Sequence, residues 1–307
     1  MKPSLFFLDG VAPTSDCLVL AAQYNEHADI DASRVLLRFG DEWTKVDFDE
    51  DVIRSLAFLA TTGTLYMLGT SGAIYTIGGR EPAFTRDSVT KTLKKEQVVD
   101  PEDRGELSRV RVVKDRVLAC GLGGQVLELV AGSWRYIGLT GEATDCPDFE
   151  DVTIAGGGMP LAVGSKGAIY VFPDKGPKQL DSPTNQYLSS VLADPAGRCF
   201  ACGNMGVVLC IDEADIADIS VDLEPIRNLW GIAFYEDRIY VCDPDRLVVR
   251  APHSLWGVEH VASVPRPTFH RLWSSAGALW SFGADHVFVM RDGRWEQVLV
   301  PGNEISP

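Results

Sequence analysis

The sequence predicts an all-β chain folded as one seven-bladed β-propeller, with four antiparallel strands in each blade. An apolar run ending in Gly or Asp recurs six times, and each copy is followed by a tight turn and a second apolar run. The terminal residue of the first run recurs after 52, 43, 39, 40 and 40 residues, at Gly69, Gly121, Gly164, Gly203, Asp243 and Gly283. A period of ~40–45 residues is typical of propeller blades.

The two apolar runs of each repeat are predicted to pair as a β-hairpin. They are too short for helices, are rich in β-branched and aromatic residues, and are joined by a turn that usually contains glycine. The first run is apolar at nearly every position, which is typical of a strand buried on both faces between packed blades.

A further strand is expected on each side of every hairpin. The preceding strands are predicted at 53–58, 107–112, 149–154, 187–192, 226–233 and 269–274. The following strand often opens with a turn and a tryptophan, at 40–43, 132–134 and 293–295. The segments 4–10, 17–22, 34–39 and 43–48 supply the seventh unit.

The predicted blades span 4–48, 53–104, 105–141, 148–184, 187–225, 226–265 and 268–302. Because every blade is contiguous in sequence, ring closure is expected to rest on packing rather than on a shared blade. The stretch 80–106 interrupts the period, and Asp87-Ser88 is expected to cap a short helix that runs through Val99 and stops at Asp100-Pro101.

The repeat resembles the broad bacterial superfamily of WD-like, YVTN-like and BNR-like propellers over nearly the whole chain. The Trp-Asp and Gly-His pairs of true WD repeats are absent. The turn at Asp292, Gly293 and Trp295 resembles an Asp-box, although its spacing is shorter than Ser-x-Asp-x-Gly-x-Thr-Trp. Such propellers include enzymes, scaffolds and inhibitors, so the resemblance implies a fold without choosing a function.

The charge balance bounds the kind of partner. The chain carries 43 acidic and 28 basic residues, for a formal charge of −15. Such a surface repels nucleic acid and anionic lipid and attracts basic partners, although the charge also serves solubility alone. The sequence lacks a signal-peptide core, a membrane-length apolar run and a disulfide-like spacing of its seven cysteines. A cytoplasmic protein is therefore expected, and its oligomeric state stays open.

Familiar catalytic motifs are missing. No phosphate loop, nucleophile elbow, dinucleotide fingerprint or metal-binding histidine spacing is present, so neither catalytic residues nor a cofactor or metal is predicted. Cys199 and Cys202 form a C-x-x-C, but residues three apart on a strand point to opposite faces. Cys120, Cys202 and Cys242 share one repeat position, which favours core packing over redox chemistry.

Acidic residues cluster in the connections between blades and in the hairpin turns, which emerge on one face of a propeller. We interpret this face as a binding site for a basic protein. A solvated surface is the plainer alternative, and calcium is a third, although no EF-hand spacing is present. The candidate partner-binding residues are Asp29, Asp31, Asp49, Glu50, Asp51, Glu142, Asp145, Asp148, Asp243, Asp245 and Asp285.

A second constellation follows from aligning the first strands of the blades. Polar residues between apolar flanks are expected to ring the mouth of the central channel, either converging on an anion or forming a hydrogen-bond network between blades. The predicted ring contains Arg54, Arg109, Glu150, Asp151, Arg227, Asn228, His270 and Arg271.

Three functions remain open at this point. The leading hypothesis is a non-catalytic binding propeller, for example an immunity-type inhibitor that neutralises a basic toxin or enzyme. The first alternative is a hydrolase or lyase for an anionic, sugar-like ligand, with Arg54, Arg109, Arg227 and Arg271 as an anion clamp and Glu150 or Asp151 as acid/base. The second alternative is an assembly chaperone or scaffold, which would expose a sizeable apolar patch.

Overall fold

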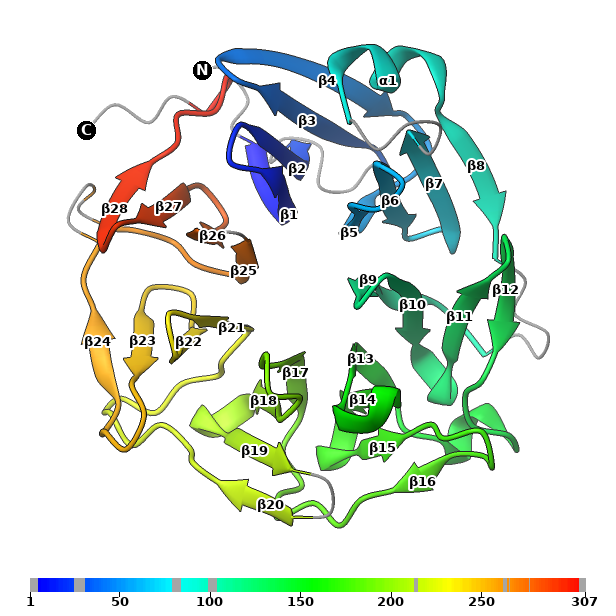
Figure 1. The fold of residues 1–307 in the computed structure, drawn as a ribbon, viewed down its shortest axis with the longest axis vertical. Coiled ribbons are helices and arrows are strands. Elements are labelled where there is room, and N and C mark those ends of the chain that lie inside the picture. Colours follow the sequence, from blue (N-terminus) through cyan, green and yellow to red (C-terminus); the bar gives the residue numbers. More distant parts are fainter. Residues whose placement is uncertain are drawn as a thin grey trace.

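The computed structural model is a ring of seven four-stranded antiparallel sheets, as the sequence predicts (Figure 1). It describes residues 5–24, 31–78, 84–98, 104–212, 215–261, 264, 266–275 and 277–303. Within each sheet the strands follow one another in chain order, and the first strand lies next to the central axis (Figure 1).

The strands of the first four blades begin and end as follows: β1 (Leu5–Thr14), β2 (Cys17–Tyr24), β3 (Ser33–Phe39) and β4 (Glu42–Phe48); β5 (Ile53–Leu59), β6 (Thr64–Gly69), β7 (Ala73–Gly78) and β8 (Lys94–Gln97); β9 (Leu107–Val113), β10 (Arg116–Gly121), β11 (Val126–Val130) and β12 (Ser133–Tyr136); β13 (Phe149–Ile154), β14 (Pro160–Gly164), β15 (Ile169–Val171) and β16 (Lys178–Gln179).

The last three blades are β17 (Leu188–Ala193), β18 (Cys199–Gly203), β19 (Val208–Asp212) and β20 (Asp215–Asp218); β21 (Gly231–Tyr235), β22 (Arg238–Cys242), β23 (Leu247–Arg250) and β24 (Gly257–Glu259); β25 (Arg271–Ser275), β26 (Ala278–Phe282), β27 (Val287–Arg291) and β28 (Arg294–Gln297).

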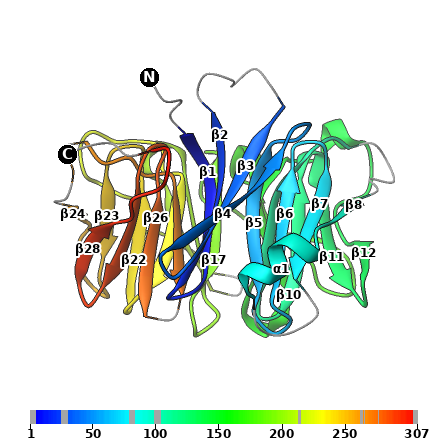
Figure 2. The same cartoon turned by 90° about the horizontal axis from the view of Figure 1, so that it is seen from above.

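The ring has two distinct faces (Figure 2). We call the face where the inner strands begin the start face, and it carries the connections between blades and the turns between second and third strands. We call the opposite face the end face, and it carries the turns between first and second strands and between third and fourth strands. The short helix α1 (Arg86–Lys91) lies at the outer rim of the ring, nearer the end face than the start face (Figures 1 and 2).

The repeated glycine at the end of the second strand has a steric cause. A Cβ atom on Gly164 would lie 1.8 Å from the carbonyl oxygen of Asp148, and one on Gly203 would lie 2.0 Å from that of Tyr187. Gly121 and Gly283 meet the backbone oxygens of Glu106 and Thr268 in the same way. The connection that enters each of these blades therefore crosses directly over the glycine, and a side chain there would displace it.

Replacement of one of these glycines should destabilise the fold. We expect Gly164→Ala to lower the free energy of unfolding by about 3 kcal/mol, because the backbone at Asp148 must move to admit the methyl group. Gly257→Ala is the matched control, since a Cβ there meets no atom within 4 Å. Urea unfolding of both variants measures the difference, and equal stability would contradict the steric explanation.

The ring closes by packing, as predicted. The first and last sheets each consist of consecutive strands, so no strand is shared between the two ends of the chain. One hydrophobic cluster spans the seam and joins Phe7 and Leu20 of the first blade to Trp280 and Phe282 of the last. The Phe7 amide also donates to the Ala284 carbonyl at 2.9 Å.

The predicted helix through Val99 is wrong. The helix α1 ends at Lys91, and Lys94–Gln97 form β8, which pairs with β7 as the outer strand of the second blade. Just after the helix, Thr92 Oγ1 accepts a hydrogen bond from the Gly78 amide at 2.7 Å, which ties this segment to the end of β7. Asp100-Pro101, the predicted stop signal, lies outside the described residues.

Cys120, Cys202 and Cys242 occupy the core position before the turn that the repeat predicts. All seven cysteines are unpaired, and these three are fully buried. Cys199 and Cys202 belong to different hydrophobic clusters on opposite faces of their blade. Burial raises the pKa of Cys199 to about 12, so the pair has the properties of core residues.

Candidate functional site

The start face carries most of the predicted partner-binding acids at exposed positions. Its exposed acids are Asp31, Asp49, Glu50, Glu142, Asp145, Asp148 and Asp245, and Asp285 is half-buried. Asp29 lies outside the described residues. Among the residues described, Asp245 is ion-paired with Arg227 at 3.3 Å, whereas the other exposed acids of this set have no cation within 4 Å. Except for Asp245, these exposed carboxylates therefore have no compensating cation among the residues that the structure describes.

Two of the predicted partner-binding acids are buried instead. Asp51 is 2% exposed and accepts hydrogen bonds from the Ser71 amide at 3.0 Å and the Tyr75 hydroxyl at 3.0 Å. Asp243 is fully buried and binds Arg246 at 2.7 Å, within its own turn. Both carboxylates are therefore engaged in hydrogen bonds that stabilise nearby turns.

Exposed apolar side chains also lie on the start face. Met205 is 59% exposed and Trp230 is 36% exposed. Met205 occupies the left-handed position of a tight turn, with φ of 56°, which projects its side chain outward. Its amide donates to Asn228 Oδ1 at 3.1 Å, and the Trp230 ring lies edge-on to His270 with centroids 4.9 Å apart. The start face thus carries exposed apolar side chains as well as acids.

The inner strands share a bulge that defines the channel layer. In blades one to five, the pairing of the first two strands skips one residue, for example Arg54 between Ile53 and Ser55. In each of these five blades, the residue after the skipped one pairs with the same repeat position of the second strand. In blades six and seven, the first-strand residue that pairs with this position is Gly231 or Arg271. The layer consists of Asp9, Ser55, Arg109, Asp151, Ser190, Gly231 and Arg271.

The predicted ring and the observed layer overlap only in part. Arg109, Asp151 and Arg271 belong to the layer, and Glu150 and His270 lie one position nearer the mouth. Arg227 and Asn228 precede β21 and do not enter the layer, because the inner strand of that blade begins at Gly231 rather than at residue 226. Arg54 is the skipped residue of its blade and points away to Glu106, at 2.8 Å.

Asp151 is the centre of a hydrogen-bond network between blades. Its carboxylate accepts two hydrogen bonds from Arg111, at 2.8 and 2.6 Å, and one from the Ser190 hydroxyl at 2.8 Å. The Val191 amide of the next blade donates at 3.0 Å, and the amide of Val152 donates at 2.9 Å. Asp151 is fully buried and therefore joins three blades through one side chain.

A second part of the network surrounds Arg109, which is 1% exposed. Its guanidinium lies 3.3 Å from Glu150 and 3.9 Å from both Asp9 and Asp151. Glu150 also accepts a hydrogen bond from the Tyr187 hydroxyl at 2.8 Å and lies 3.7 Å from Arg271. Cations and carboxylates thus alternate around the channel and compensate one another.

The pKa values of this network reflect burial and pairing. Burial would raise the pKa of Asp151, but Arg111 outweighs it and lowers that pKa to about 2. Burial, and then Arg109, lower the pKa of Arg271 to about 10. Burial, followed by the charges of Arg271 and Arg109, lowers the pKa of His270 to about 3, so the imidazole is neutral at pH 7.

The anion clamp of the enzymatic alternative does not form. Each of its four guanidinium groups already lies near a carboxylate: Arg54 near Glu106, Arg109 and Arg271 near Glu150, and Arg227 near Asp245. Arg54 and Arg227 are also absent from the channel layer. The arrangement instead matches the hydrogen-bond network between blades, which was the other alternative that the sequence predicted for this ring.

Sequence reasoning missed Asp9, Arg111, Ser190 and Tyr187. Asp9 could have been found, since it occupies the bulge-equivalent position of the first blade, but its neighbours in sequence are not apolar on both sides. Arg111 lies two residues after Arg109 and therefore on the same side of the strand. Ser190 follows Ser189, the residue that the pairing of its blade skips.

In the part of the chain that the structure describes, no group of three or more His, Cys, Asp or Glu side chains is arranged to hold a metal ion. No helix in the same part of the chain is long and apolar enough to cross a bilayer.

Comparison with known proteins gives one curated relative and many related folds. No family model matches the chain. The Immune protein Tsi7 of Pseudomonas aeruginosa is 26% identical over 232 residues, which cover 72% of this chain and 74% of that protein.

Solved structures share the fold at low sequence identity. The WD40 β-propeller domain of Doa1 superposes with a TM-score of 0.72 at 11% identity, covering 99% of this chain and 96% of that one. YCF48 from Cyanidioschyzon merolae gives 0.67 at 12% identity, with 94% and 96% covered. YCF48 bound to D1 peptide gives 0.64 at 13% identity, with 100% and 96% covered.

Proposed function

We propose that this chain is an immunity-type protein that neutralises a basic toxin or enzyme by binding it with the start face. The similarity to the Immune protein Tsi7, over almost three quarters of both chains, carries the proposal. The YCF48 propeller binds D1 peptide in its solved structure, which supports a polypeptide as the ligand of this fold.

The start face supports a basic partner. Its uncompensated acids Asp49, Glu50, Glu142 and Asp145 attract cations and accelerate association with a positively charged surface. Met205 and Trp230 supply the apolar contact that charge alone lacks, and Trp and Met are enriched in protein interfaces. Chain-wide, the charge of −15 reinforces the attraction.

The proposal is tested first by finding the partner. The tagged chain is purified from its own host at low salt, and co-purifying proteins are identified. A stoichiometric basic protein that dissociates at high salt is expected. Expressed alone in a second host, that protein should arrest growth, and co-expression of this chain should restore it. Absence of a basic partner, or a partner without toxic activity, would overturn the proposal.

Charge neutralisation then tests the face. We expect the combined change Asp49→Asn, Glu50→Gln, Glu142→Gln and Asp145→Asn to weaken binding of the purified partner about tenfold and to flatten its salt dependence. The matched control, on the end face, is Asp115→Asn, Asp174→Asn, Asp237→Asn and Asp292→Asn, where all four acids are also exposed. Calorimetric titration measures both, and equal weakening would show that net charge rather than the face is responsible.

A further inference from the structure

Three turns of the start face share one backbone conformation. They join the second and third strands of blades three, four and five, at 121–124, 164–167 and 203–206. The third residue of each turn is left-handed, with φ of 59° at Gly123, 56° at Lys166 and 56° at Met205. Glycine adopts this conformation without steric cost, whereas residues with a Cβ atom are usually strained there. Lys166 and Met205 therefore keep side chains at positions that glycine would occupy more favourably.

The turn at Met205 has room for its side chain. In blade three, a Cβ atom at Gly123 would lie 2.9 Å from the Cβ atom of Ala143, so packing requires glycine at that position. Met205, by contrast, is 59% exposed, and a mainly exposed side chain adds little core packing to offset the strain. A strained residue whose side chain faces solvent is a candidate for function rather than for stability.

The Met205 backbone is fixed by hydrogen bonds to the segment that enters the sixth blade. The Met205 amide donates to Asn228 Oδ1 at 3.1 Å, and the Gly206 amide donates to the Arg227 carbonyl at 2.7 Å. The side chain therefore projects from a preorganised backbone, which lowers the entropy lost when a partner binds it. Because the thioether chain is unbranched and polarizable, it adapts to the shape of an apolar pocket.

Trp230 belongs to the same entering segment and is 36% exposed. The preceding Leu229 amide donates to the Gly203 carbonyl at 3.0 Å, at the start of the Met205 turn. The Trp230 carbonyl accepts a hydrogen bond from Arg271 Nη1 at 2.9 Å, which ties the segment to the seventh blade. Two exposed apolar residues thus project from backbone segments that hydrogen bonds hold together.

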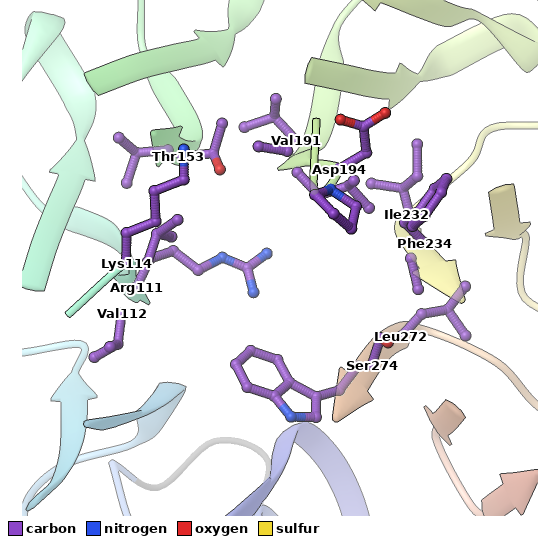
Figure 3. A pocket seen from close by; sticks show the side chains of 17 residues that line it. Arg111, Val112, Lys114, Thr153, Val191, Asp194, Ile232, Phe234, Leu272 and Ser274 are labelled. Atoms are coloured by element: carbon purple, nitrogen blue, oxygen red, sulfur yellow. The ribbon is translucent and has the colours of Figure 1, made fainter. Parts of the chain in front are cut away.

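The cavity of the central channel lies on the far side of the ring from these residues. Its volume is about 360 Å³, and it is lined by the second halves of the inner strands, toward the end face (Figure 3). Arg111 lines this cavity and is bound to Asp151 at 2.6 Å, whereas Arg109 of the charged layer is 1% exposed. The charged layer thus separates the cavity from the start face, and a partner on that face is expected to contact projecting side chains instead.

Lys166 gives the equivalent position of the fourth blade the opposite chemistry. It is exposed on the same face and has the same left-handed backbone as Met205, but it carries a positive charge that repels a basic partner. The two residues therefore separate the effect of the backbone conformation from that of the side chain.

We propose that Met205 is the apolar anchor of the start face, and that the basic partner carries an apolar pocket beside its positive charges that receives this side chain. The inference rests on the proposed function and names the residue that sets the lifetime of the complex. Exposed acids such as Asp49 and Glu142 govern the encounter, because charge acts at long range. Close apolar contact at Met205, with Trp230 on the adjoining segment, governs dissociation.

The strain is tested without the partner. We expect Met205→Gly and Met205→Asn to raise the midpoint of thermal unfolding by about 1–3 °C, because both new residues tolerate the left-handed region. Lys166→Gly should give a rise of similar size. A lower midpoint for both Met205 variants would show that the side chain serves the fold, and it would overturn the proposal.

Binding kinetics test the anchor itself. The probe is the basic protein that co-purifies with the tagged chain at low salt, purified and immobilised. We expect Met205→Gly and Met205→Asn to raise the dissociation rate of the complex about tenfold, with the association rate unchanged within about twofold. Met205→Leu, which keeps an apolar side chain of similar volume, should retain slow dissociation. Lys166→Gly is the matched control and should leave the dissociation rate unchanged.

The variant in which Asp49, Glu50, Glu142 and Asp145 are neutralised separates this inference from the proposed function. If that variant binds the probe more weakly while Met205→Gly dissociates like the unchanged chain, the start face binds the partner without this anchor, and the anchor proposal fails alone. If neither variant changes binding, the partner binds elsewhere and both proposals fail. Equal acceleration by Lys166→Gly would show that turn flexibility, rather than the Met205 side chain, is responsible, and it would also overturn the anchor proposal.

Discussion

Replacing Asp151 by Asn should lower the free energy of unfolding by about 3–5 kcal/mol, the usual effect of removing one partner of a buried ion pair. The carboxylate is fully buried and accepts hydrogen bonds from Arg111, Ser190 and the Val191 amide. An amide has one acceptor oxygen, so at least one donor loses its partner, and the charge of Arg111 is left in a poorly hydrated layer. Urea unfolding measures the difference.

The matched control is Asp181→Asn. Asp181 is exposed, and we expect this change to stay within about 0.5 kcal/mol. The outcome that contradicts the argument is a similar small effect for both variants, which would mean that water reaches the layer and solvates Arg111.

The Asp151 carboxylate should also make the free energy of unfolding depend on pH. Its pKa is about 2 in the folded chain against a reference value of 3.8, so the folded state binds the proton less readily than the unfolded state. Its contribution, about 2 kcal/mol, is complete above pH ~4 and is lost as pH falls toward 2. Asp151→Asn should flatten this part of the stability curve, and an unchanged slope would show that other acids dominate it.

The repeat was sufficient to predict the architecture. Propeller blades place the same residue types at the same positions, and the glycine that ends the second strand is required because the incoming connection crosses it, as at Gly164 and Gly203. Short strands with apolar residues on both faces and tight turns identify a blade without long-range information. Contiguous blades also predicted closure by packing.

The channel layer was less predictable because a bulge shifts side-chain direction by one residue. An alignment on apolar flanks places Arg227 and Asn228 in the layer, but the chain before β21 is irregular and the strand starts at Gly231. At Gly231, a Cβ would lie 3.0 Å from the His270 carbonyl oxygen, so the layer position has no room for a side chain. The hydrogen-bonded pairing of β21 with β22, rather than the apolar pattern of the sequence, decides which residue enters the layer.

Burial of the acids was also invisible in the sequence. Asp49 and Asp51 are two residues apart, yet the first is exposed and the second is 2% exposed. A Cβ on Gly69 would lie 2.1 Å from the Asp51 carboxylate, so in this blade the carboxylate fills the space that a backbone carbonyl occupies in others. Whether a carboxylate or a backbone carbonyl fills this space depends on the path of the chain before the strand, which the sequence pattern does not show.

The seam between the first and last blades is the second place where a single substitution should have a large effect. Phe282 is 1% exposed in β26, and a Cβ on Gly10 of β1 would lie 2.5 Å from its ring. The ring therefore packs flat on the backbone of the first blade. We expect Phe282→Ala to cost about 3–5 kcal/mol, as large aromatic truncations in a core usually do.

The location of the damage separates closure from ordinary core packing. Phe200→Ala, buried at 4% exposure in the cluster shared by the fifth and sixth blades, is the matched control of similar cost. Chain connectivity holds those two blades together, whereas the seam is held by noncovalent contacts. Hydrogen exchange should therefore accelerate chiefly in β1, β2, β26 and β27 for Phe282→Ala, and around β18 and β22 for Phe200→Ala. Uniform acceleration over all blades in both variants would instead mean that the ring unfolds as one cooperative unit and that its seam is no weaker than its other interfaces.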